Sequence, residues 1–314
     1  MKRRIIVSLI VLVVGFAMMG VGFAYGGIRP LGLGWNGPAF GLVQNTNNMV
    51  RVDQTWKNAS GITSLRVDLA MINRVEIRAE GDSFSVKGQN WELAGGLQAK
   101  LAGGTLTVES GESKNHVLWP GILGFIPPLR ADECSVVVTV PAGVTLDTVN
   151  AETGIGQLHV TGIDAKTLVL NSSTGNTTLQ DVSADSFKMT SSVGNCTLDN
   201  VRAQTSNFSI DTGNFTANSF TSTKGLTFKK SLGNAVFTDA VLNGDSRFDK
   251  STGNLTLSLR MPRESVGYEI NSSTGNVRID GAKVQGDASN TPPGAENHLS
   301  VTSSLGNVTI DFTS

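Results

Sequence analysis

Apolar and polar residues alternate in short segments along most of this chain, in a unit that returns about every 20 residues after Gly154. A glycine followed by asparagine marks each unit, with steps of 19 to 22 residues and a last step of 31. These pairs are Gly175-Asn176, Gly194-Asn195, Gly213-Asn214, Gly233-Asn234, Gly253-Asn254, Gly275-Asn276 and Gly306-Asn307, with Gly154 interpreted as a first member that lacks the asparagine. Such a period indicates a solenoid, whose repeats bury their apolar faces only by stacking on their neighbours.

The alternation within each unit has the period of a strand. The fourth residue after each glycine is apolar in every unit: Leu158, Leu179, Leu198, Ala217, Phe237, Leu257, Ile279 and Ile310. A second alternating segment precedes most of the glycines, as in Phe187 and Met189. A period of two is typical of a half-buried strand, and no run keeps the helical spacing of 3.6. We therefore predict an all-β fold, a single-stranded parallel β-helix or β-solenoid with about 20-residue coils.

The Gly-Asn pairs are expected to have a structural role. Glycine at a corner permits a positive φ that a Cβ atom would disfavour. The asparagine either adopts the corner geometry itself or stacks its amide on the asparagines above and below. We interpret the row as a hydrogen-bond ladder within the protein rather than as a binding site.

The first 26 residues predict a membrane anchor. Three basic residues precede residues 5–25, which carry no charge and are numerous enough to span a bilayer. We predict a single-pass protein of the cell membrane with its N-terminus inside and its ectodomain outside. The alternative is a signal peptide, cleaved after small residues near Ala24, and a secreted protein.

Three further segments follow the leader. Residues 27–60, rich in Gly, Pro, Asn and Gln, predict a linker. Residues 61–150 predict N-terminal β coils that contain an apolar insertion at 117–129, and residues 151–314 form the Gly-Asn repeat.

Composition and charge narrow the function classes. The chain has 314 residues, 39% of them hydrophobic, and 36 glycines, which fits an all-β repeat protein. Without the three basic residues of the leader, 22 basic residues stand against 26 acidic ones, a net charge of −4. This balance does not favour a nucleic-acid partner, which requires a basic surface.

We expect neither catalysis nor a cofactor. The three histidines, His116, His159 and His298, lack other residues at metal-ligand spacing, and the sequence contains no nucleophile elbow or P-loop. A carbohydrate-active β-helix enzyme would need carboxylates along one outer face. Asp181 and Asp239 share a column of the repeat, but Ser219 and Leu259 interrupt it. The two cysteines, Cys134 and Cys196, are expected to be free thiols because several coils separate them.

Two surfaces are candidates for interaction. The apolar insertion either packs over the solenoid as a flap or contacts a membrane or partner, with Trp119, Ile122, Leu123, Phe125 and Ile126 as its large side chains. Lys230 and Lys250 stack in one column and suggest a basic patch for an anionic wall polymer. The alternative is a solvated face flanked by Asp211 and Asp249.

One segment resembles a known family. The strand that ends in Val138-Thr139-Val140-Pro141-Ala142-Gly143, followed by Ala151-Glu152-Thr153-Gly154 and serial Gly-Asn turns, is similar to the bacterial "putative adhesin" family of unknown function. The resemblance covers residues 60 to 314. It implies a β-strand-repeat ectodomain at the cell surface or envelope, with some relatives linked to envelope stress responses, and it implies no catalytic residues.

The expected function is therefore that of a non-catalytic envelope protein with adhesin-like binding or scaffolding. An envelope-stress sensor that acts through a membrane partner is the first alternative, and a carbohydrate-active enzyme is the second. Expected partners are the membrane through residues 5–25 and a cell-wall polymer, a host surface or a membrane protein.

Overall fold

The structure of the 314-residue chain is a computed structural model. It describes residues 31–36, 39–44, 52–57, 61–89, 96–110, 135–284 and 287–313. The chain divides into two compact units, residues 1–49 with 113–133 and residues 50–112 with 134–314. In the first unit, β1 (Leu31–Asn36) and β2 (Ala39–Gln44) form an antiparallel hairpin.

Several predictions fall outside the described residues. These are the anchor or signal peptide at 1–26, the apolar insertion at 117–129 and Cys134. No helix of membrane-spanning length and apolarity lies in the part of the chain that the structure describes. The predicted linker differs from the structure, since 27–60 contains β1, β2 and β3 (Val52–Trp56). Its Gly and Pro residues suggested a loop, but tight hairpins need such turn residues too.

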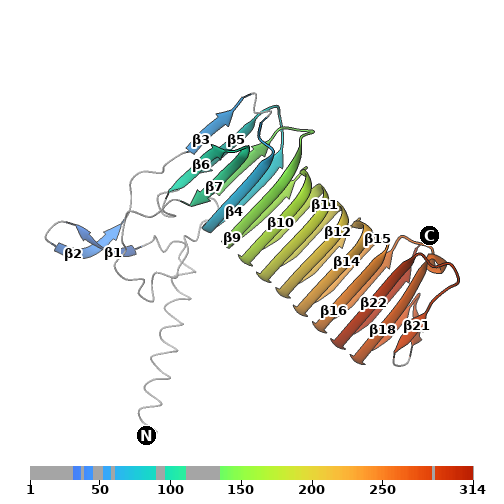
Figure 1. Ribbon diagram of the computed structural model, residues 1–314. Coiled ribbons are helices and arrows are strands. Elements are labelled where there is room, and N and C mark those ends of the chain that lie inside the picture. Colours follow the sequence, from blue (N-terminus) through green and yellow to red (C-terminus); the bar gives the residue numbers. More distant parts are fainter. Residues whose placement is uncertain are drawn as a thin grey trace, which may run out of the picture. The chain divides into compact units, whose positions relative to one another are not determined.

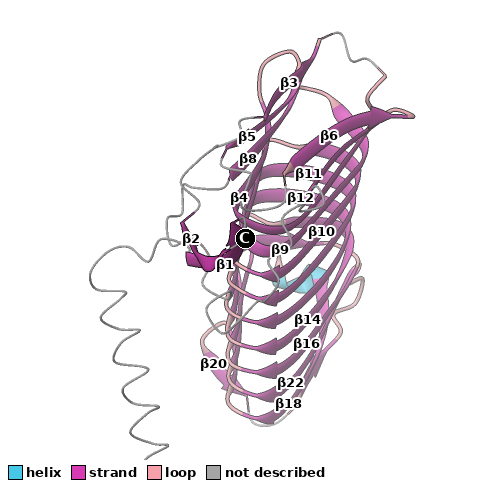
Figure 2. Ribbon diagram, turned by 90° about the vertical axis from the view of Figure 1, so that its left-hand side faces the viewer, coloured by secondary structure: helices cyan, strands magenta, loops and turns pink. Residues whose placement is uncertain are grey.

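The second unit is a stack of β coils, as the period predicted (Figure 1). Each coil has a long strand segment, a corner at the Gly-Asn pair, a short strand segment and a second corner. The regular part consists of β9 (Thr145–Thr161), β10 (Asp164–Thr174), β11 (Thr177–Val193), β12 (Cys196–Thr212), β13 (Phe215–Asn218), β14 (Thr221–Leu232), β15 (Ala235–Leu242), β16 (Asp245–Thr252) and β17 (Leu255–Leu259). Neighbouring coils pair in parallel, so that Leu168 lies beside Phe187 and Leu179 beside Leu198. Figure 2 shows the long strands as successive ribs of the stack.

The core lies inside the coils and follows the alternation. Inward residues of successive coils form columns, such as Met189, Phe208, Phe228 and Phe248, all nearly inaccessible to solvent. The phenylalanines in the middle of the stack contact each other through ring edges and tilted faces, with Phe228 and Phe237 5.4 Å apart between ring centres. Apolar burial of this kind is the main stabilising contribution to a repeat protein.

The C-terminal coils do not stack in sequence order. The last coil consists of β22 (Asn297–Leu305) and β23 (Val308–Phe312), and the coil before it of β18 (Val266–Thr274) and β19 (Val277–Ile279). A short 3-10 helix, Arg263–Ser265, precedes β18. β22 pairs with β16 on one side and with β18 on the other. The final coil of the chain is therefore inserted between two earlier ones, an arrangement that the sequence analysis did not anticipate.

The coils at the N-terminal end do not stack in sequence order either. β4 (Ser64–Ala79) pairs in parallel with β9 on one side and with β7 (Thr105–Ser110) and β8 (Ser135–Val140) on the other. The first coil of the sequence is thus covered by a later one.

Antiparallel strands close both ends of the stack. β5 (Phe84–Gln89) pairs with β8 and β3, while β6 (Leu97–Ala102) pairs with β7. At the other end, β20 (Ala282–Val284) pairs with β19, and β21 (Ala288–Asn290) with β18. An open solenoid end presents unpaired backbone groups that promote aggregation, so these strands act as caps.

The corner glycines are required by close approach of successive coils. Gly194 has φ +149°, and a Cβ atom there would overlap the carbonyl oxygen of Gly175. The first member of the row is corrected by the structure. Gly175 lies on Gly156 rather than on Gly154. The inward residue four places after this corner is therefore Val160 instead of Leu158.

The asparagines form a ladder along the outside of this corner. The Oδ1 of Asn176 accepts a hydrogen bond from the backbone N–H of Asn195 at 2.9 Å, and the pattern continues up the stack. Its remaining steps join Asn195 to Asn214, Asn214 to Asn234, Asn234 to Asn254, Asn254 to Asn307 and Asn307 to Asn276. The expected ladder is confirmed. It connects side chain to backbone, and the asparagine side chains remain exposed.

The column that contains Asp181 lies at the second corner of the coils. Asp181, Asn200, Ser219 and Asp239 all have φ between 51° and 54°, a conformation that Asp and Asn tolerate better than most residues. Asn200 donates to Asp181, and Ser219 to Asp239. These carboxylates belong to a turn, whereas Leu259 points into the core beside Ala240.

Candidate functional site

A β-bulge in the middle of the stack interrupts the regular long face. The register between β12 and β14 shifts after Ala203, so that Thr205 lies beside Gly225. The buried Ser222 hydroxyl donates to the Gly225 carbonyl at 2.7 Å and stabilises the bulge. Gly225 has φ +129°, and a Cβ atom there would collide with the backbone of Asp245. The extra residue places the Lys224 side chain outside the sheet, which is a common use of bulges near functional sites.

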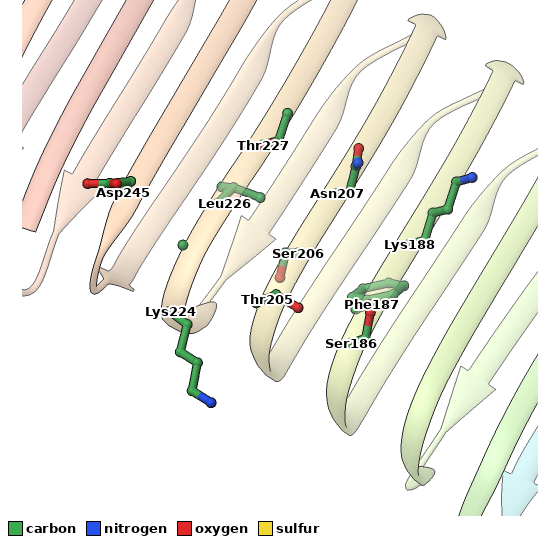
Figure 3. Close-up of a pocket in the computed structure, with 11 residues that line it drawn as sticks. Ser186, Phe187, Lys188, Thr205, Ser206, Asn207, Lys224, Leu226, Thr227 and Asp245 are labelled. Carbon is green, nitrogen blue, oxygen red and sulfur yellow. The ribbon is translucent and has the colours of Figure 1, made fainter.

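A hollow of about 460 Å³ lies beside this bulge (Figure 3). It extends across β11, β12, β14 and β16 and is lined by Ser186, Phe187, Lys188, Thr205, Ser206, Asn207, Lys224, Gly225, Leu226, Thr227 and Asp245. Ser206 lies in an inward column between Phe187 and Leu226. In the neighbouring outward row Gly225, which has no side chain, lies between Thr205 and Asp245 and leaves this part of the outer face less filled than its neighbours.

The hollow offers hydrogen-bonding groups, the amines of two lysines and one exposed carboxylate, that of Asp245, which leaves a net positive charge. Thr205 and Asn207 are exposed and bring a hydroxyl and an amide, and Thr227 adds a half-buried hydroxyl. Lys188 and Lys224 are exposed, and neither forms an ion pair with a residue that the structure describes. This set can bind a polar, negatively charged ligand through amines and hydroxyls. Within the described ranges, no cluster of three His, Cys, Asp or Glu side chains could hold a metal ion.

The predicted basic patch of Lys230 and Lys250 is wrong. The two lysines do stack in one column, but they are only 2% and 3% exposed and point into the solenoid. The Nζ of Lys230 donates to the carbonyls of Gly213 and Leu232, whereas the Nζ of Lys250 has no hydrogen-bond partner in the described structure. Both lie two residues after an inward phenylalanine, so alternation places them inside despite their charge.

Burial changes the proton affinity of these groups. Desolvation, and secondly the neighbouring Lys230, lowers the pKa of Lys250 to about 8. Desolvation also lowers the pKa of Lys230. Cys196 is a free, buried thiol, as predicted, and burial raises its pKa. The interior therefore disfavours charge on all three side chains.

The sequence analysis did not identify the hollow. Trp119, Ile122, Leu123, Phe125 and Ile126, the predicted interaction residues of the insertion, lie outside the described residues. One signal of the bulge was present in the spacing, since the step from Gly213 to Gly233 is 20 residues where the two preceding steps are 19. The added residue and the Lys224-Gly225 pair mark the bulge.

Structural comparison finds several solved structures of bacterial proteins with a similar backbone trace. A putative adhesin from Bacteroides fragilis is 13% identical, with 84% of this chain and 97% of that chain covered and a TM-score of 0.45. A putative lipid binding protein from Parabacteroides distasonis is 12% identical, with 86% and 98% covered and a TM-score of 0.44. A putative adhesin from the same organism is 11% identical, with 85% and 98% covered and a TM-score of 0.40.

Sequence comparison yields one family. Among curated proteins, none matches this chain significantly. The pattern of one protein family matches residues 62–311, which comprise the capped solenoid from just before β4 to β23. The chain belongs to the Toastrack DUF4097 family.

Proposed function

We propose that this chain is a non-catalytic, adhesin-like envelope protein whose solenoid binds an anionic polysaccharide in the hollow beside the Lys224 bulge. The observation that carries the proposal is the pair of exposed lysines, Lys188 and Lys224, without ion-pair partners among the described residues, around a polar depression. The ligand class follows from this chemistry, because amines and hydroxyls together suit a polymer with hydroxyl and carboxylate or phosphate groups.

The shape of the site supports an extended ligand. The hollow crosses four strands of the same face, and each coil adds about 4.8 Å along the stack. A polymer lying along the stack would therefore contact several coils at once, and weak contacts would add up. The predicted leader supports display outside the cell membrane, where such polymers occur.

The test is binding of the purified full chain, in mild detergent, to immobilised polygalacturonate, with neutral dextran as reference polymer. We expect binding to the charged polymer that weakens as salt is raised. Substitution of both lysines, Lys188→Ala with Lys224→Ala, should weaken binding about tenfold, a loss of about 1.4 kcal/mol.

The matched control is Lys87→Ala with Lys283→Ala, which removes two exposed lysines from the cap strands β5 and β20. It changes the net charge by the same amount but leaves the hollow intact, so binding should be retained. Equal loss in the control and in the variant without Lys188 and Lys224 would show that only overall charge matters and would overturn the proposed site. Equal binding to dextran would overturn the proposed ligand class.

A further inference from the structure

A row of exposed aliphatic side chains follows the Gly-Asn corner at every second coil. The row consists of the residue before each corner glycine, in the order of the stack: Ile155, Thr174, Val193, Thr212, Leu232, Thr252, Leu305 and Thr274. The four aliphatic residues are 42% to 50% exposed. Threonine occupies the same place in every other coil, so packing of the coil does not require an aliphatic residue there.

The surface around this row is almost free of charge. We define the Gly-Asn edge as four rows in these eight coils: the corner glycine, the two residues before it and the residue after it. Fifteen of these 32 positions are the corner Gly and Asn residues themselves; of the other 17 only Asp211 is charged, whereas the overall content of 16% would place about three charges there. Depletion of charge around exposed aliphatic groups is a mark of protein interfaces rather than of solvated surface.

The order of the row makes the edge complementary to itself. We propose that the Gly-Asn edge is a self-association surface, on which two copies of this chain pack antiparallel about a two-fold axis between Thr212 and Leu232. This axis brings each aliphatic residue of one copy opposite a threonine of the other. The facing pairs are Leu232 with Thr212, Val193 with Thr252, Leu305 with Thr174 and Ile155 with Thr274.

The alternation matters for this fit. A ninth coil, that of β4, continues the row beyond Ile155 at Met71 and has no counterpart in this pairing. A parallel arrangement at equal height would place Leu232 against Leu232 and leave gaps between facing threonines. The antiparallel arrangement fills each gap along all eight coils and closes as a dimer. The one charged position, Asp211, lies in a coil next to the axis, so its two copies repel each other and weaken the association.

The area predicts a weak, reversible dimer. Eight coils at about 4.8 Å give an edge roughly 38 Å long. With a width of roughly 10 Å the dimer buries about 800 Å² in total, below the approximately 1,200 Å² of stable complexes. Association therefore becomes substantial when copies are concentrated, as on one membrane or cell surface.

Sedimentation velocity of the full chain in mild detergent, over a concentration series, tests the surface. The wild-type chain should shift from monomer to dimer as its concentration rises, and Val193→Lys with Leu232→Lys should raise the dissociation constant more than about tenfold. The control, Gln180→Lys with Thr238→Lys, adds the same charge at exposed positions near the second corner and should dimerise normally. A wild-type chain that stays monomeric, or equal dimerisation of both variants, would overturn the proposal.

Disulfide trapping tests the orientation. In a Cys134→Ser background, a mixture of Val193→Cys and Thr252→Cys chains should form a crosslinked heterodimer under mild oxidation. Neither chain alone should crosslink, because equivalent positions lie three coils, roughly 14 Å, apart across the axis and a disulfide spans at most about 7 Å between Cα atoms. A disulfide between two copies of the Val193→Cys chain would instead indicate parallel packing and would refute the two-fold arrangement.

Discussion

At the scale of single residues, Lys250 should make stability depend on alkaline pH. Its pKa in the folded protein is about 8, while an unfolded lysine has a pKa of about 10.4. Between these values the unfolded chain binds more protons, so the free energy of unfolding rises with pH across this window. Lys250→Met should stabilise the protein at pH 7 and reduce this rise, which urea unfolding at pH 7 and 10 measures.

The neighbouring lysine provides the comparison. The Nζ of Lys230 donates to the carbonyls of Gly213 and Leu232. Lys230→Met removes both hydrogen bonds, although the Leu232 carbonyl still accepts from the Gly213 N–H, and should therefore stabilise less or even destabilise. If Lys250→Met unfolds with the same pH dependence as the wild-type chain, the amine does not titrate in this window.

Two adjacent corner residues should differ strongly in their effect on stability. Gly194→Ala places a methyl group against the Gly175 carbonyl at a φ that alanine rarely adopts. We expect a loss of more than about 3 kcal/mol. Asn195→Ala removes one exposed hydrogen bond and should cost about 0.5–1.5 kcal/mol. Denaturant unfolding of both variants measures the difference, and equal losses would contradict the proposed close approach of the coils.

At the scale of an element, the phenylalanines of β12 to β16 form one packed cluster. Phe237 contacts four other rings, those of Phe215, Phe220, Phe228 and Phe248. Phe237→Ala should cost about 3–5 kcal/mol and reduce hydrogen-exchange protection in the neighbouring coils. Phe187, which contacts the ring of Phe208, is the matched site. A loss at Phe187→Ala equal to that at Phe237→Ala would show that the ring cluster adds nothing.

At the scale of the whole molecule, the inserted last coil should stabilise residues that precede it in the chain. Deletion of residues 297–313 would only shorten a solenoid stacked in sequence order. Here it removes the parallel partner of β18 and exposes β16 and β17. We expect β18 to lose hydrogen-exchange protection and the truncated chain to aggregate. Continued protection of Val266–Thr274 in the truncated chain would contradict this.

The candidate hollow shows the limit of prediction from spacing. The 20-residue step that includes Lys224 and Gly225 indicates an added residue, but the hollow also depends on Gly225 lying between Thr205 and Asp245. That neighbour relation follows from the register of separate coils. The buried lysines could have been predicted, because Lys230 follows Phe228 by two residues and shares its inward direction.

The sequence by itself determined the coil, its corners and the direction of most side chains. These features follow from local rules: strand alternation has a period of two, and the φ of a corner depends on its own residue. The Gly-Asn period and the apolar columns could therefore be predicted without a structure.

Only the tertiary structure decided the order of coils at the two ends, because pairing between distant strands depends on long-range contacts. In sequence order the last residues of the edge are Thr252, Thr274 and Leu305, which breaks the alternation of threonine and aliphatic residue. Insertion of β22 between β16 and β18 restores it. The proposed self-complementary edge thus exists only in the folded stack.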